Sequence, residues 1–201
     1  MPVAREQLVS EGIDPGRLVF VDDAATDGSI NGHRVLAYDD FMNEEASDRF
    51  VAIAIADSND RERLAAKCGA DQISGWTVRA DNVVIMDDAE IGEGALLSPF
   101  VTITSNIRIG KFFHANLYSY VEHDCRIGDF VTFAPGVKCN GNVVIEDHAY
   151  IGAGAILRQG TTGSPLRIGR GAVVGMGAVV TGDVAAGVTV VGNPARPMAE
   201  R

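Results

Sequence analysis

The chain has 201 residues, of which 46% are apolar and 22% are charged, values typical of a folded protein. The net charge of −10, without any basic stripe, argues against a nucleic-acid partner. No apolar run reaches the roughly 20 residues of a membrane helix, and the first residues lack the apolar core of a signal peptide. Three widely spaced cysteines indicate neither a disulfide framework nor a zinc site, so we expect a cytoplasmic protein with no membrane partner and no metal.

The first part of the chain is predicted to be a small acidic α/β domain over residues 1–76. This part holds 15 acidic and 7 basic side chains, a net charge of −8. The apolar run 50–56 is typical of a strand buried on both faces. Alternating strands and helices favour a small parallel sheet. In chain order, the expected elements are a helix over 2–10, a strand over 18–21, a short helix over 39–45, a strand over 50–56 and a helix over 60–67.

The second part, residues 77–201, has a sequence period of six. It holds 17 of the 23 glycines. Every sixth residue from 91 to 157 is apolar, an outcome with a chance probability of roughly one in ten thousand at this composition. The inward series is Ile91, Leu97, Ile103, Ile109, Ala115, Val121, Ile127, Phe133, Cys139, Ile145, Ile151 and Leu157.

Each six-residue unit is predicted to be a short strand followed by a bend, because the position three residues later often holds glycine, asparagine or aspartate. Three units make a triangular coil of 18 residues, and stacked coils form a parallel β-helix. The period begins near residue 85 and is interrupted once, by five extra residues at 163–167. Those residues form either a plain surface loop or a loop that borders a ligand.

The period also predicts which side chains face inward and which stack outside. Cys125 and Cys139 fall on inward positions and are predicted to be buried, inert thiols. Two aromatic columns are predicted to point outward, where they would form either a subunit interface or a surface covered by another segment of the chain. These columns are Phe100 with Tyr118, and Phe112 with Phe130 and His148.

The repeat resembles that of the left-handed β-helix acyltransferases, the hexapeptide transferase superfamily. The resemblance covers residues 77–196 and includes the closing segment 190–196. In that superfamily this segment lies at the coenzyme A side, which implies that Gly192, Pro194 and Arg196 contact the acetyl-CoA cosubstrate. The superfamily forms trimers with the active site between neighbouring chains, so the resemblance implies a homotrimer.

A narrower resemblance joins residues 116, 121–130 and 139–143 to the sialic-acid O-acetyltransferase and bacillosamine-pathway UDP-amino-sugar N-acetyltransferase group. In that group a small N-terminal βαβ domain holds the nucleotide or sugar, and residues 20–23, 31–36 and 54–59 are similar to its segments. The group's first strand and glycine-rich turn are missing, so we expect an incomplete nucleotide-sugar site. The resemblance implies substrate contacts by Asp22, Asp23 and Asn116; Asn116 is alternatively a plain bend residue.

Acyl transfer needs a base, an oxyanion donor and a channel that aligns the thioester. His123 is predicted to point outward from a bend, and Asp124 beside it can hold the imidazole. The residue stacked 18 positions later is Gly141, which leaves room for a thioester and offers a backbone N–H. In the group the equivalent histidine is the base and the glycine amide contacts the thioester, which implies that Gly141 and Asn142 bind the cofactor.

The sequence thus predicts a mainly β protein, a left-handed parallel β-helix with a small N-terminal α/β domain, that transfers acetyl groups from acetyl-CoA to a sugar. The favoured reaction is N-acetylation of a nucleotide-linked amino sugar, by direct transfer with His123 as base; the alternative is sialic-acid-type O-acetylation. The histidine spacings of 9 and 25 residues do not fit the zinc ligands of a γ-type carbonic anhydrase. A serine O-acetyltransferase would have a long helical N-terminal domain, which the sequence does not show. A non-catalytic scaffold is a further alternative.

Overall fold

The computed structural model describes residues 1–25 and 28–198, which divide into two compact units, Met1–Arg49 and Phe50–Arg201. This division falls earlier than residue 76, the boundary suggested by composition. Residues 50–76 belong with the coils because the helix in this segment packs directly on them, as described below. No helix in the described part of the chain is long and apolar enough to cross a membrane.

The first unit contains two helices and a small mixed sheet. Strand β3 pairs in parallel with β1 and in antiparallel with β2, so β2 and β3 form a hairpin. Asn31 and Gly32 make its turn with positive φ angles, the geometry that Asn-Gly pairs favour. The sequence analysis found both helices and β1 but missed this hairpin. The elements are α1 (Pro2–Ser10), the 3₁₀ turn η1 (Pro15–Arg17), β1 (Phe20–Val21), β2 (Ser29–Ile30), β3 (His33–Leu36) and α2 (Tyr38–Asn43).

The second unit begins with β4 (Phe50–Val51), α3 (Ser58–Ala70) and β5 (Ser74–Gly75), and β4 pairs in parallel with β5. The expectation of a strand over 50–56, buried on both faces, is wrong. The strand ends at Val51, and Phe50 is 60% exposed. The run stops pairing because the chain turns into α3, where the Asp57 side chain accepts hydrogen bonds from the first amides of the helix.

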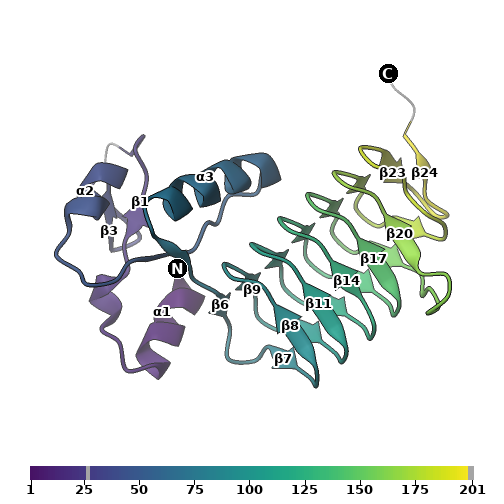
Figure 1. Cartoon of the computed structure of the whole chain (residues 1–201), viewed down its shortest axis with the longest axis horizontal. Coiled ribbons are helices and arrows are strands. Elements are labelled where there is room, and N and C mark those ends of the chain that lie inside the picture. Colours follow the sequence, from purple (N-terminus) through teal and green to yellow (C-terminus); the bar gives the residue numbers. More distant parts are fainter. Residues whose placement is uncertain (26–27, 199–201) are drawn as a thin grey trace. The chain divides into compact units, whose positions relative to one another are not determined.

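The rest of the unit is a left-handed parallel β-helix, with coils stacked in order from β6 to β24 (Figure 1). One face has eight strands: β6 (Val78–Arg79), β9 (Leu96–Leu97), β12 (His114–Ala115), β15 (Thr132–Phe133), β18 (Tyr150–Ile151), β21 (Val173–Val174), β23 (Thr189–Val191) and β24 (Arg196–Pro197). The second face has six: β7 (Val84–Ile85), β10 (Thr102–Ile103), β13 (Tyr120–Val121), β16 (Lys138–Cys139), β19 (Ile156–Leu157) and β22 (Val179–Val180). The third has five: β8 (Ala89–Ile91), β11 (Ile107–Ile109), β14 (Arg126–Ile127), β17 (Val143–Ile145) and β20 (Leu166–Ile168).

The inward series predicted from the six-residue period forms the core of the coil. Leu97, Ile103, Phe133 and Ile151 are among its members that solvent barely reaches. Partners in neighbouring coils lie 18 residues apart, as in the pairing of Val78 with Leu96. The coil therefore already begins at β6, earlier than residue 85, because Val78 and its neighbours pair although their sequence does not follow the repeat.

Bends join the faces at three corners. Corner A joins the eight-stranded face to the six-stranded face, corner B the six-stranded to the five-stranded face, and corner C the five-stranded back to the eight-stranded face. Positive φ angles recur at these bends, even at the aromatic residues Phe100 and Tyr118 of corner A. The extra residues after Leu157 lie at corner B, between β19 and β20.

The two aromatic columns differ in exposure. At corner A, Phe100 stacks on Tyr118 with 4.8 Å between ring centroids, and both rings are exposed, as predicted. At corner C, Phe112 and Phe130 also stack, at 5.4 Å, but both are buried. For this second column the covered alternative is confirmed, because Ile53 clusters with both rings and Leu64 of α3 packs against them.

Candidate active site

His123 and Asp124 form a hydrogen-bonded pair at corner B. His123 Nδ1 lies 2.8 Å from Asp124 Oδ2, and each side chain is just under half exposed. The hydrogen bond from His123 holds the pKa of Asp124 below its usual value, and a second bond from Asn106 acts in the same direction. Because an ionised carboxylate only accepts, Nδ1 is the nitrogen that donates to Asp124. In the neutral ring this tautomer leaves the lone pair on Nε2.

Gly141 lies directly over the free face of this imidazole. A Cβ atom placed on Gly141 would stand 2.6 Å from His123 Cε1 and Nε2. The stacking of Gly141 on His123, deduced from the 18-residue coil, is therefore present in the structure. Among the described residues, none accepts a hydrogen bond from the Gly141 amide N–H. His123 Nε2 thus lies against a glycine whose N–H has no acceptor among the described residues.

The insertion at corner B is attached to the bend that carries Gly141. Gly160 N donates to Gly141 O at 2.9 Å, and Leu166 N donates to Asn142 O at 3.2 Å. The side chain of Asn142 is buried and faces Thr162, whose hydroxyl lies 3.4 Å from Asn142 Oδ1. The insertion therefore stands one coil above Gly141, on the same corner as the candidate base.

Cys125 and Cys139 lie inside the coil behind this bend. Both are fully buried, with free thiols whose sulfur atoms are 4.0 Å apart. The Cys125 thiol donates to Asn140 O at 3.3 Å, and Val143 N donates to the Cys125 sulfur at 3.4 Å. The hydrogen bond with the Cys125 thiol, together with burial, raises the pKa of Cys139 well above its usual value. The predicted inward placement is confirmed, and neither sulfur faces solvent.

Asn116 lies at corner A, whereas His123 lies at corner B of the same coil, so the two occupy opposite ends of one face. Asn116 Nδ2 donates to Phe133 O at 2.8 Å, an interaction that supports the backbone of the next coil. The closing segment follows β23 at the last turn of the coil. Gly192 has a φ of +89°, Asn193–Pro194 is a cis peptide, and Arg196 donates to Ala195 O.

Asp22 and Asp23 belong to the first unit, where both carboxylates make local hydrogen bonds. Asp22 Oδ1 accepts from Ala24 N at 2.9 Å, and Asp23 Oδ1 accepts from Tyr38 N at the start of α2 at 2.7 Å. Among residues 1–25 and 28–198, none donates a hydrogen bond of this kind to the second oxygen of either carboxylate. Their predicted contact with the substrate stays a prediction.

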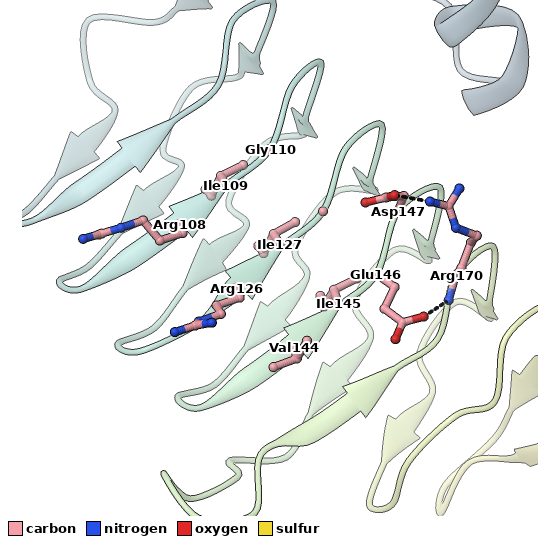
Figure 2. Close-up of a pocket in the computed structure, with 11 residues that line it drawn as sticks. Arg108, Ile109, Gly110, Arg126, Ile127, Val144, Ile145, Glu146, Asp147 and Arg170 are labelled. Atoms are coloured by element: carbon pink, nitrogen blue, oxygen red, sulfur yellow. Dashed lines mark hydrogen bonds and ion pairs between the residues drawn. The ribbon is translucent and has the colours of Figure 1, made fainter.

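Two grooves lie on the surface of the second unit, and neither is lined by His123 or Gly141. One, of about 550 Å³, follows the five-stranded face past Arg108 and Arg126 to Arg170, whose guanidinium pairs with Asp147 (Figure 2). The other, of about 530 Å³, lies between the first turn of α3 and the coil. Within residues 1–25 and 28–198, no three His, Cys, Asp or Glu side chains are grouped so as to hold a metal ion.

The side-chain contacts of Asn106, Arg61 and His114 were not predicted from the sequence. Asn106 Nδ2 donates to Asp124 Oδ1 at 3.2 Å, and its position 18 residues before Asp124 could have revealed it. Arg61, fully buried on α3, donates to the carbonyl oxygens of Ile55 and Phe130. Burial lowers the pKa of Arg61 to about 10. His114 donates to Ile53 O at 3.0 Å, and burial, with the charge of Arg61, lowers the pKa of His114 to about 4.

A histidine paired with an acid, next to a glycine at the corner of a left-handed β-helix, is the arrangement expected of an acyltransferase of the hexapeptide-repeat class. No protein-family model matches the chain. The GDP-perosamine N-acetyltransferase of Escherichia coli O157:H7 is 50% identical over 198 residues, which cover 98% of this chain and 90% of that protein. The chain therefore belongs to the family of nucleotide-amino-sugar N-acetyltransferases, and the predicted group is confirmed.

Solved structures agree with this assignment. WeeI from Acinetobacter baumannii AYE is 56% identical, with a TM-score of 0.95 and coverage of 98% of this chain and 92% of that one. The acetyltransferase domain of PglB from Neisseria gonorrhoeae FA1090, in complex with acetyl coenzyme A, is 26% identical, with a TM-score of 0.72 and coverage of 98% and 93%. These likenesses extend through both units and bear out the predicted fold and enzyme class.

Proposed function

We propose that this chain transfers an acetyl group from acetyl-CoA to the amino group of a nucleotide-linked amino sugar, with GDP-perosamine as the first candidate acceptor. Half of its residues are identical to those of the Escherichia coli enzyme named for that sugar, over nearly the whole of both chains. The observation that carries the mechanism is the placement of His123 Nε2 directly beneath Gly141.

His123 acts as the general base in the proposed reaction. Its Nε2 removes a proton from the acceptor amine as the amine nitrogen forms a bond to the thioester carbonyl carbon. The Gly141 N–H donates to the oxyanion of the tetrahedral intermediate. Collapse of the intermediate breaks the C–S bond, and the protonated imidazole returns its proton to the departing thiolate. Asp124 stabilises the positive charge on the ring between these two proton transfers.

The cosubstrate is proposed to follow corner B from Gly141 and Asn142 toward the closing segment. Coils are spaced by about 4.8 Å, so the two coils between Gly141 and β22 span roughly 10 Å. Gly192 O accepts from Val179 N of β22, which fixes the closing segment at the end of this path. Gly192, Pro194 and Arg196 are proposed to contact the nucleotide end of coenzyme A. The acetyl-CoA bound by the related gonococcal domain supports this choice of cosubstrate.

The acceptor is proposed to contact Asn116, Asp22 and Asp23. Asn116 uses its Nδ2 on the backbone, but its Oδ1 remains available to a sugar. Asp22 and Asp23 each offer one carboxylate oxygen to hydroxyl or base N–H groups. Isothermal titration of Asp22→Asn and Asp23→Asn with the nucleotide sugar tests this part of the proposal. Affinity equal to that of the unaltered protein in both variants would remove these residues from the site.

A homotrimer is proposed as the active assembly, in a cytoplasmic setting that suits three free cysteines. In a single chain Asn116 and His123 lie at different corners, and threefold packing would bring corner A of one chain near corner B of its neighbour. The exposed stack of Phe100 (51%) on Tyr118 (64%) is an apolar surface suited to such packing. Light scattering should give about 64 kDa, three times the 21.2 kDa chain; an active monomer would contradict the proposal.

Steady-state kinetics of two variants test the mechanism. His123→Ala should lower kcat by about 10²–10⁴-fold, the usual contribution of a positioned base, with little change in acetyl-CoA affinity. Asp124→Asn should lower kcat by a smaller factor than His123→Ala, because Asp124 orients the imidazole ring without touching the substrate. Asp88→Asn is the matched control: Asp88 is an exposed acid at corner B that pairs with Arg108. An unchanged kcat in His123→Ala, or an acetylated enzyme trapped by mass spectrometry, would refute direct transfer by this base.

A further inference from the structure

A column of four residues at corner B alternates between carboxylic acid and amide. The column consists of Asp88, Asn106, Asp124 and Asn142, one residue from each of four successive coils, all with positive φ between 52° and 61°. Aspartate and asparagine tolerate this left-handed conformation better than other side chains apart from glycine. The conformation accounts for a preference for these residue types but not for the choice of amide at Asn106.

The side chain of Asn106 provides the second hydrogen bond to the carboxylate of Asp124, the partner of His123. Asp124 Oδ2 binds His123 Nδ1 at 2.8 Å, and Asp124 Oδ1 accepts from Asn106 Nδ2 at 3.2 Å. A carboxylate tied at one oxygen can still rotate about its terminal bond, whereas one tied at both oxygens has its plane fixed. The imidazole that shares this carboxylate is thereby held with its Cε1 and Nε2 against Gly141.

Other residues with suitable backbone preferences would not do this. Aspartate in place of Asn106 would bring a second negative charge to about 3 Å from the Asp124 carboxylate, and repulsion would turn the two groups apart. Glycine would adopt the φ of +61° but would leave Asp124 Oδ1 to water. The backbone of Asn106 is held independently of its side chain, because the backbone N–H of Asn106 donates to Asp87 O at 3.1 Å. The two coils are also joined here by the backbone, where Asp124 N donates to Ser105 O at 3.3 Å, so the side chain of Asn106 adds the hold on the Asp124 carboxylate.

We propose that Asn106 is a positioning residue for acyl transfer: by fixing the Asp124 carboxylate from the coil below, it aims His123 Nε2 at the thioester. This inference rests on the proposed role of His123 as base. Asn106 does not touch the substrate; it acts only through Asp124.

A double-mutant cycle in kcat tests the proposal. Asn106→Ala should lower kcat by about three- to tenfold, the worth of one hydrogen bond, while KM for both substrates stays within twofold. In the Asp124→Ala background the same substitution should change kcat by less than a factor of 1.5, because the group through which Asn106 acts is gone. Equal losses in the two backgrounds would overturn the proposal.

Asn106→Gly separates positioning from folding. Glycine restores the backbone freedom that the φ of +61° requires, so this variant should unfold close to the temperature of the parent enzyme and still show the kcat loss of Asn106→Ala. A parental kcat in Asn106→Gly would overturn the proposal. Asp88→Ala is the matched control, since it removes an acid of positive φ from the same column without reaching Asp124. A parental kcat in His123→Ala is the separate outcome that would instead reject the proposed base.

Discussion

Adding one methyl group at Gly141 should test the geometry of the site most directly. In Gly141→Ala the new Cβ would begin 2.6 Å from His123 Cε1 and Nε2. Carbon atoms in contact stay about 3.5 Å apart or more, so the ring must retreat by about 1 Å. The ring cannot retreat freely, because its Nδ1 is hydrogen-bonded to Asp124. Misplacement of a catalytic group by 1 Å costs roughly 10²-fold in rate, so we expect kcat/KM to fall by about that factor.

The assay is release of free coenzyme A thiol as the amino sugar is acetylated, at varied concentrations of each substrate. Gly182→Ala is the control, because a Cβ at Gly182 meets no atom within 4 Å and neither glycine has a positive φ. Gly141→Val should act more strongly, since its larger side chain also fills the path of the thioester. A folded Gly141→Ala enzyme with parental kcat and KM would refute the placement of the reacting carbonyl beside this glycine.

Three further substitutions test the surroundings of the site. The pKa of His114 is about 4 in the folded protein and 6.5 as its ordinary value, so between these pH values the unfolded chain binds a proton that the folded chain does not. The free energy of unfolding should therefore fall by about 3 kcal/mol from pH 6.5 to pH 4. In urea titrations, His114→Gln should flatten this pH dependence. Cys125→Ser should lower the free energy of unfolding by about 1 kcal/mol but keep kcat within twofold, and loss of turnover would contradict its structural role. Arg61→Met should cost about 3 kcal/mol in denaturant unfolding because it strips donors from buried carbonyl oxygens, including Phe130 O.

The coil and its candidate base could be predicted because the rules that govern them are local. Each inward position must be apolar, so the period of six appears in the sequence itself. Once the coil length of 18 is known, stacking follows by arithmetic, and Gly141 is placed over His123 without any structure. The same arithmetic places Asn106 in the column of Asp124, one coil below.

The features that were missed depend on contacts between distant parts of the chain. Period alone cannot show that Phe112 and Phe130 are covered, since the covering residue Ile53 precedes them by about 60 positions or more. The early end of β4 has the same origin: the chain leaves the sheet to enter α3, whose Arg61 is fixed by Phe130 O on the coil. Neither effect can be predicted from hydropathy, because an apolar run such as 50–56 is as consistent with a buried strand as with a short strand that leads into a helix.

The 18-residue offset shared by most paired strands of the coil also bears on how the chain assembles during synthesis. Val78 meets Leu96 and Thr102 meets Tyr120, and even the insertion widens the offset only to that between Tyr150 and Val173. Each coil can therefore be laid on the edge of the one before it as soon as it leaves the ribosome, without waiting for distant sequence. The antiparallel pairing of β24 with β23 then covers the last edge of the eight-stranded face, which would otherwise template further chains. The coil can thus form from its N-terminal end toward its C-terminal end, and β24 ends the strand pairing on the eight-stranded face.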